Sequence, residues 1–109
     1  MSWEIEFLPE ADEEIDGLDG SVKKRALSII NRAAKNPLPH DEGGYGSPLR
    51  NTQEAKLAGL LKLKLKSSGL RVVYALKRTK TTMTVIVVGV REDSEVYREA
   101  EKRRIRYDL

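Results

Sequence analysis

Hydrophobic and polar residues alternate with period two at two places along the chain. Residues 3–7 read Trp-Glu-Ile-Glu-Phe, and residues 61–66 read Leu-Lys-Leu-Lys-Leu-Lys. Only a β-strand turns such alternation into one apolar and one polar face, so both segments are predicted to be strands. In the second strand the leucines share the buried face, whereas three lysines share the open face: Lys62, Lys64 and Lys66.

The sequence after the second strand predicts a tight hairpin. Residues 67–69 read Ser-Ser-Gly, and glycine readily takes the positive φ that such a turn needs. An apolar partner strand is expected over residues 70–77. If the last two turn residues form a two-residue loop, Lys66 faces Arg71 across the hairpin. Directly opposed residues share a face, so Arg71 joins the lysines. A G1 bulge at the turn would shift this register by one residue.

Apolar residues recur at helical spacing in two segments before the middle of the chain. Residues 10–18 and 21–35 are predicted to form an antiparallel helical hairpin, because Asp19-Gly20 interrupts the pattern between them. Ser21 is the expected N-cap of the second helix, and Asn36-Pro37 ends it. The apolar stripe of this hairpin is expected to pack on the sheet.

The last third of the chain predicts one more strand and a final helix. Residues 83–90 are β-branched and almost uniformly apolar, as in a central strand buried on both faces. The helix opens at residues 92–95, where acids suit the helix dipole and Asp93 or Ser94 can cap it. The order β-α-α-β-β-β-α predicts one α+β domain over residues 1–109. Its N-terminal strand and helical hairpin pack on a mostly antiparallel four-stranded sheet.

Residues 36–55 follow neither period. Three glycines and three prolines occur within residues 36–48, which predicts a mobile loop rather than a regular element. His40, the only histidine, lies in this loop and is expected to be a surface residue. Because no second ligand accompanies it, no metal site is predicted.

The net charge of +3 hides a strong segregation along the chain. Residues 1–54 carry 6 Lys/Arg against 11 Asp/Glu, whereas residues 55–109 carry 14 against 6. From Lys56 to Arg91 there are nine cations and no acid. A basic segment of this kind is typical of proteins with a polyanionic partner, most often nucleic acid.

Composition places the protein in a reducing compartment. The chain has no cysteine, so disulfides and thiolate chemistry are excluded. No apolar run approaches the length of a membrane span, and no export segment is visible. A cytoplasmic protein without membrane association is expected.

The open sheet face gathers the candidate chemistry. The predicted topology adds two residues to the cations of the hairpin: Arg91 at the end of the last strand and Tyr97 at the start of the last helix. This set contains no carboxylate pair, Ser–His pair or metal cluster. It can bind a phosphodiester and stabilise the charge of a pentacoordinate phosphorus. RNA supplies its own nucleophile, the 2′-hydroxyl, so no cofactor is expected.

Two runs of sequence resemble the RelE toxins of bacterial toxin–antitoxin systems. Residues 62–74 read KLKLKSSGLRVVY, and residues 88–97 read VGVREDSEVY. The shared motifs are a basic hairpin, a Val-Gly-x-Arg strand end and a Ser-Glu-Val-Tyr helix start. The similarity is strongest from Leu60 to about Arg104 and is topological before that. The 36–55 loop is longer than expected for this family.

The resemblance implies a ribosome-dependent mRNA interferase, which cuts mRNA in the ribosomal A site without a metal and inhibits translation. It implies that Lys62 and Lys64 assist proton transfer and charge stabilisation, that Arg71 and Arg91 hold the scissile phosphate, and that Tyr97 positions a nucleotide. Further RNA contacts are expected from Lys66, Arg98 and Arg104. The implied partners are a cognate RelB-like antitoxin, the ribosome and mRNA, with a toxin that is itself monomeric.

Two alternatives stay open on the sequence. A ParE-like relative would share the fold and poison DNA gyrase, although that branch generally lacks this set of cations. A non-catalytic module that binds nucleic acid or an antitoxin would retain the basic face without cutting RNA.

Overall fold

The computed structural model describes residues 2–53, 55–66, 68–90 and 92–109. The predicted α+β class and the order of the main elements are confirmed. The elements are β1 (Glu4–Phe7), α1 (Pro9–Asp16), α2 (Gly20–Ala33), the 3₁₀ turn η1 (His40–Glu42), β2 (Ser47–Pro48), β3 (Leu61–Leu65), β4 (Leu70–Lys77), the 3₁₀ turn η2 (Arg78–Lys80), β5 (Thr82–Gly89) and α3 (Asp93–Arg106). No helix in the described ranges is long and apolar enough to cross a lipid bilayer.

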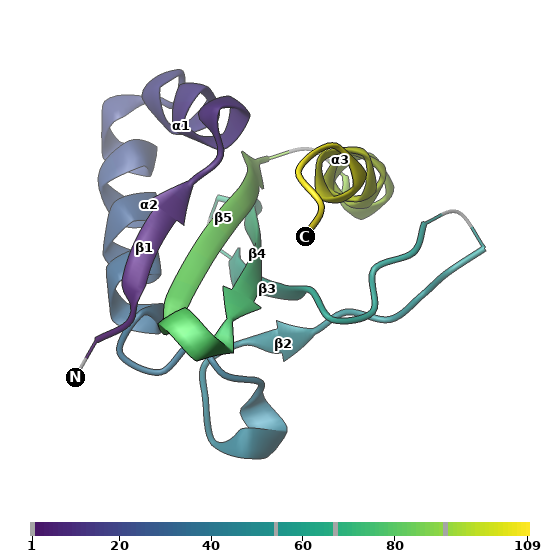
Figure 1. Cartoon of the computed structure of the whole chain (residues 1–109). Coiled ribbons are helices and arrows are strands. Elements are labelled where there is room, and N and C mark those ends of the chain that lie inside the picture. Colours follow the sequence, from purple (N-terminus) through teal and green to yellow (C-terminus); the bar gives the residue numbers. More distant parts are fainter. Residues whose placement is uncertain (1, 54, 67, 91) are drawn as a thin grey trace.

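The sheet has five strands in the order β1-β5-β4-β3-β2, one more than the four predicted. β1 runs parallel to β5, and the other neighbours are antiparallel. Helices α1 and α2 lie on one side of the sheet and α3 on the other (Figure 1). Every residue of β5 is buried, which confirms the prediction of a strand covered on both faces.

The fifth strand, β2, lies within the segment predicted to be an irregular loop. Ser47 pairs with Lys62 and Pro48 with Leu61, so β2 covers only the first part of β3. Proline lacks the N–H of a ladder donor and is tolerated here because β2 is an edge strand. A two-residue strand that contains proline leaves no period-two pattern, which is why the sequence did not reveal it.

A buried tyrosine ties the segment before β2 to the sheet. The Tyr74 hydroxyl donates to the Pro37 carbonyl at 2.7 Å, and Tyr74 is fully buried. Burial raises the pKa of Tyr74 far above its ordinary value, so the phenol stays a donor. Gly46 passes so close that a Cβ there would lie 2.2 Å from the Tyr74 hydroxyl. This contact requires glycine at position 46.

The hairpin between β3 and β4 differs from the predicted register by two residues. Arg71 pairs with Lys64 instead of Lys66, and Leu70 pairs with Leu65. The turn between Leu65 and Leu70 is longer than two residues: the Ser68 N–H donates to the Leu65 carbonyl at 3.3 Å, and Gly69, with φ +70°, is the last residue before β4. A shift by an even number preserves the alternation of faces, so Arg71 still shares the lysine face, as predicted.

Both predicted helix caps are wrong. Helix α2 starts at Gly20 with Asp19 in the N-cap position, and the Ser21 hydroxyl donates to the Asp19 carboxylate at 2.7 Å. Helix α3 has Glu92 in the N-cap position, without a side-chain cap bond. Asp93 and Ser94 therefore lie inside α3, and the carboxylate of Asp93 is used elsewhere.

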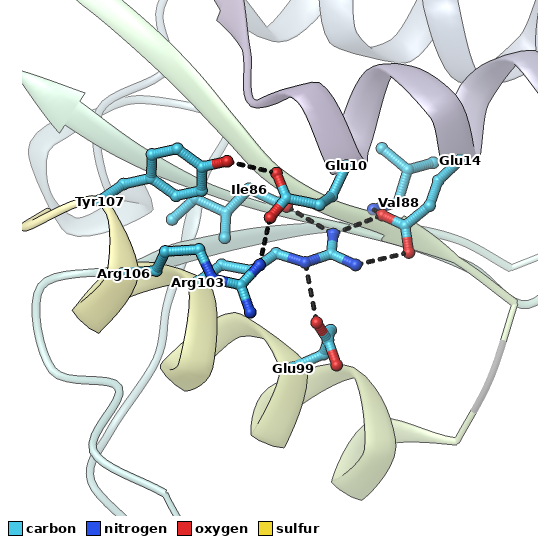
Figure 2. Close-up of polar contacts among 8 residues, drawn as sticks. All are labelled: Glu10, Glu14, Ile86, Val88, Glu99, Arg103, Arg106 and Tyr107. Carbon is cyan, nitrogen blue, oxygen red and sulfur yellow. Dashed lines mark hydrogen bonds and ion pairs between the residues drawn. The ribbon is translucent and has the colours of Figure 1, made fainter.

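Helix α3 is docked on the sheet by a buried arginine (Figure 2). Arg103 is only 6% exposed and donates to the Glu14 carboxylate of α1 at 2.6 and 3.1 Å. It also donates to the Ile86 carbonyl of β5 at 2.9 Å and to Glu99 at 3.0 Å. Glu14 in turn accepts the Val88 N–H at 3.2 Å. We call these residues the Arg103 cluster; it joins α1, β5 and α3.

A second contact supports the end of α3. The Tyr107 hydroxyl donates to the Glu10 carboxylate at 2.7 Å, and Arg106 pairs with the same carboxylate (Figure 2). The basic run at the end of α3 is therefore partly used to hold the helix against α1.

Candidate functional site

The site is built on the face of β3 and β4 that carries the lysines. Alternation along β3 directs its leucines to the α1–α2 side and its lysines to the α3 side. Lys62 lies opposite Val73 and Lys64 opposite Arg71 on the neighbouring strand. Three cations are thereby fixed on one sheet face by strand geometry alone.

Helix α3 brings Tyr97 onto this face. The Lys62 ammonium donates to the Tyr97 hydroxyl at 2.9 Å and lies 5.7 Å from the centre of its ring. Lys62 and Tyr97 are 35 positions apart in sequence, so this contact depends on the docking of α3. The two residues, predicted to share a site, are therefore in direct contact.

Arg71 has a carboxylate partner that the sequence did not reveal. Its Nε donates to Asp93 Oδ1 at the start of α3, and its Nη1 donates to the Gly69 carbonyl at 2.9 Å. The Arg71 side chain is 16% exposed and that of Asp93 is 46% exposed. An acid in the first turn of a helix is expected from the dipole alone, so this signal did not single out Asp93.

The remaining predicted residues are distributed around this centre. Lys64 is exposed beside Arg71, Lys66 is exposed in the turn after β3, and Arg98 is exposed on α3 directly after Tyr97. Arg91 lies outside the described residues. The predicted cluster is thus assembled around Lys62, Lys64, Arg71 and Tyr97.

Arg104 lies about two helical turns beyond Tyr97 on the same side of α3. Its guanidinium donates to the Leu109 carbonyl at 2.9 Å and to the Lys56 carbonyl at 3.2 Å. The segment between β2 and β3 projects from the sheet beside α3 (Figure 1). Arg104 contacts this segment through the Lys56 carbonyl, and its predicted role in RNA binding stays a prediction.

The Tyr97 side chain borders a hollow of about 400 Å³. Thr52, Gln53 and Ala55 line it from the projecting segment, and Ser94 lines it from α3. A short turn fixes this part of the segment, because the Ala55 N–H donates to the Thr52 hydroxyl at 3.0 Å. The predicted loop thus contributes one wall of a hollow next to the site.

The donors of the site suit an anionic oxygen-rich ligand. Two ammonium groups, a guanidinium and a phenol lie on one sheet face, and together they offer many N–H and O–H donors to phosphate oxygens. No group of three or more His, Cys, Asp or Glu gathers as metal ligands within the described part of the chain. His40 is exposed in η1, in agreement with the predicted surface position.

The chain is similar in sequence and in fold to RelE toxins. No protein-family model matches the chain. Over 51 residues the chain is 53% identical to the mRNA interferase toxin RelE of Escherichia coli strain K12, which covers 44% of this chain and 54% of that protein. A variant of the E. coli toxin RelE in the free state superposes with a TM-score of 0.75 at 31% identity, over 94% of this chain and 98% of the other. A variant of E. coli RelE bound to an antitoxin RelBc peptide gives 0.68 at 30% identity, over 92% and 95%.

Proposed function

Because the chain belongs to the RelE family of toxins, we propose that it cuts mRNA in the ribosomal A site as the toxin of a type II toxin–antitoxin system. The observation that carries the proposal is the contact of Lys62 with Tyr97 beside the Lys64–Arg71 pair. These four side chains come from three elements and form one donor-rich face. A similar protein named mRNA interferase toxin RelE supports the RNA substrate.

The proposed reaction uses the 2′-hydroxyl of the substrate as nucleophile. Its oxygen attacks the adjacent phosphorus, the bond from phosphorus to the 5′-oxygen breaks, and a 2′,3′-cyclic phosphate and a 5′-hydroxyl result. One proton leaves the 2′-hydroxyl and one reaches the departing 5′-oxygen. Lys62 and Lys64 are proposed to assist these transfers and to stabilise the added charge on phosphorus.

Tyr97 is proposed to position a nucleotide. Its hydroxyl oxygen already accepts a hydrogen bond from Lys62, so its own proton is directed to another acceptor. The hollow beside the ring, walled by the segment between β2 and β3, offers space for an unstacked base. Bases stack readily on aromatic side chains.

Arg71 is proposed to hold the scissile phosphate. In the structure its Nε binds the half-exposed carboxylate of Asp93. A carboxylate and a phosphate offer similar acceptors to a guanidinium, so phosphate would compete with Asp93 for this group. Arg91 is assigned the same task on the sequence motif alone, because it lies outside the described residues.

The site is proposed to work without a metal and to need the ribosome for alignment. Correct placement of reacting groups can contribute about 7–11 kcal/mol, far more than one cationic contact. The absence of a metal is tested with a substrate in which sulfur replaces a non-bridging oxygen of the scissile phosphate. Because no metal would bind this oxygen, the sulfur should slow cutting equally in Mg²⁺ and in Mn²⁺. Rescue of the sulfur substrate by Mn²⁺ would contradict a metal-free site.

A RelB-like antitoxin is the proposed inhibitory partner, supported by a similar toxin solved with an antitoxin peptide. A segment that covers the basic face would block RNA by occupying the same cations. The toxin itself is proposed to be a cytoplasmic monomer outside such complexes.

The proposal is tested by inducing the chain in a bacterial host and mapping new RNA ends within translated codons. The parent should cut within codons on ribosomes. Lys62→Ala should lower the cleavage rate by about 10²–10³, the loss expected for one donor to a developing negative charge. Lys80→Ala is the matched control, since Lys80 is an exposed cation in η2 at the other end of β4. An unchanged RNA-end pattern on induction of the parent, or equal loss in the control, would refute the assignment.

A further inference from the structure

A second hollow, bordered by basic residues, adjoins the site on the side of α2. Its volume is about 430 Å³, and it lies between α2, the segment before β2, and β3. We call it the α2–β3 hollow. Four basic residues border it, and none of the described residues that line it is acidic: Arg32, Lys62, Lys64 and Lys66. Because the Lys62 ammonium points to Tyr97 and Lys64 shares that side of β3, the charge in the hollow comes chiefly from Arg32 and Lys66. A site of this charge selects an anionic ligand.

The hollow also offers an aromatic and apolar surface. Tyr45 is 50% exposed, and the Arg32 guanidinium lies 5.5 Å from the centre of its ring, within the range of a cation–π contact. Ile29, Ala33 and Leu63 add apolar lining. Cations for phosphates combined with an exposed ring for a base are the features with which proteins bind single-stranded nucleic acid.

The α2–β3 hollow shares strand β3 with the proposed cleavage site. Lys62 and Lys64 line the hollow and also belong to the face that carries Arg71 and Tyr97. The short β2 pairs only with the first two residues of β3, so it leaves the rest of β3 open toward the hollow. A strand of RNA bound on the sheet face can therefore pass over β3 into the hollow.

We propose that the α2–β3 hollow is a second nucleotide subsite, in which Arg32 and Lys66 bind a phosphate and Tyr45 stacks on a base of the same mRNA strand. The inference rests on the proposed function for the identity of the strand. It adds Arg32 and Tyr45 to the residues that bind substrate. It also gives the segment before β2, held by Tyr74 and Gly46, a role in presenting the Tyr45 ring.

The test measures binding separately from cutting. The probe is a short single-stranded RNA with 2′-O-methyl groups throughout, which the proposed reaction cannot cut, and its dissociation constant is measured by fluorescence anisotropy over a range of salt. Tyr45→Ala should weaken binding about 5-fold to 150-fold, the loss of one stacked base. Tyr45→Phe keeps the ring and should bind like the parent.

The contribution of Arg32 to phosphate binding is tested by the salt dependence of the dissociation constant. Arg32→Gln should reduce the slope of log K against log salt by about 0.7, as expected for one phosphate contact to a single strand. Lys80→Gln removes an exposed cation outside the hollow and should leave the slope unchanged. Because Tyr45 and Arg32 are both exposed, thermal unfolding of the variants should match that of the parent.

The outcomes separate the subsite from the proposed function. If Tyr45→Ala and Arg32→Gln bind the probe like the parent, the subsite is refuted, whereas cutting of ribosome-bound mRNA by the parent would still support the proposed function. If the parent binds the probe through both residues and cuts no mRNA, the subsite stands and the proposed function fails. Variants that lose only antitoxin binding would show that the hollow binds protein and would refute an RNA subsite.

Discussion

Replacing Arg103 by methionine should destabilise the protein strongly, although Arg103 lies outside the proposed site. Burial lowers the pKa of Arg103, and hydrogen bonds to Glu14 and Glu99 more than offset this and raise it, so the group stays charged. The Arg103→Met change would remove the Arg103 guanidinium from the Glu14 carboxylate, which is only 21% exposed. Breaking a buried pair in this way costs about 3–5 kcal/mol.

The structure places the expected loss at the lower end of that range. Glu14 keeps the Val88 N–H at 3.2 Å, and both Glu14 and Glu99 retain some solvent access. We therefore expect about 3 kcal/mol, or a fall in Tm of about 12 °C for a domain of this size. Urea and thermal unfolding followed by circular dichroism measure both quantities.

Two variants make the test specific. Arg106→Met removes a neighbouring arginine whose side chain is 56% exposed, and an exposed pair of this kind should cost less than about 1 kcal/mol. Glu14→Leu combined with Arg103→Met removes both charges of the pair and should recover much of the loss. If Arg103→Met is no more destabilising than Arg106→Met, the account of how α3 is docked is wrong.

Two further predictions concern charged contacts of α3. Asp93→Asn should tighten binding of the 2′-O-methyl RNA about 2-fold to 5-fold. The substitution removes a half-exposed carboxylate that competes with phosphate for Arg71, and an ion pair of this kind contributes about 0.5–1 kcal/mol. Weaker binding by the variant would contradict this competition. The Tyr107 hydroxyl, with Arg106, lowers the pKa of Glu10 below its ordinary value of 4.5. The ionised Glu10 carboxylate therefore stabilises the folded protein fully above pH 4.5, and this stabilisation is lost as the pH falls through the lowered pKa of Glu10. The Tm difference between the parent and Glu10→Gln should shrink from about pH 6 to about pH 3, and a constant difference would contradict the linkage.

The cationic face could be predicted from sequence because alternation fixes which residues share a face. Lys62, Lys64 and Arg71 were placed together correctly even though the hairpin register was wrong by two residues. Register depends on the backbone of the turn, where Gly69 takes φ +70°, and residue types alone did not determine how many residues the turn contains. The fifth strand was missed because it has only two residues.

The contacts that position α3 could not be read from the sequence. Arg103 stands within a run of basic residues that is typical of a solvated helix end, and nothing local distinguishes it from Arg106. Its burial depends on Glu14, 89 positions earlier in the chain. For the same reason the sequence predicts only a cap at Asp93. An acid at a helix start has an adequate local explanation, whereas its pairing with Arg71 is a tertiary contact.

The central claim is that a cation–tyrosine site cuts mRNA through the 2′-hydroxyl of the substrate and relies on the ribosome to align it. The most direct measurement is the single-turnover cleavage rate on reconstituted ribosomes with a defined codon in the A site. The same mRNA is measured free in solution and with a 2′-deoxy nucleotide before the cut. We predict rapid cutting only on the ribosome and only with the 2′-hydroxyl present. Equal rates on free RNA, or cutting at the 2′-deoxy position, would contradict the account.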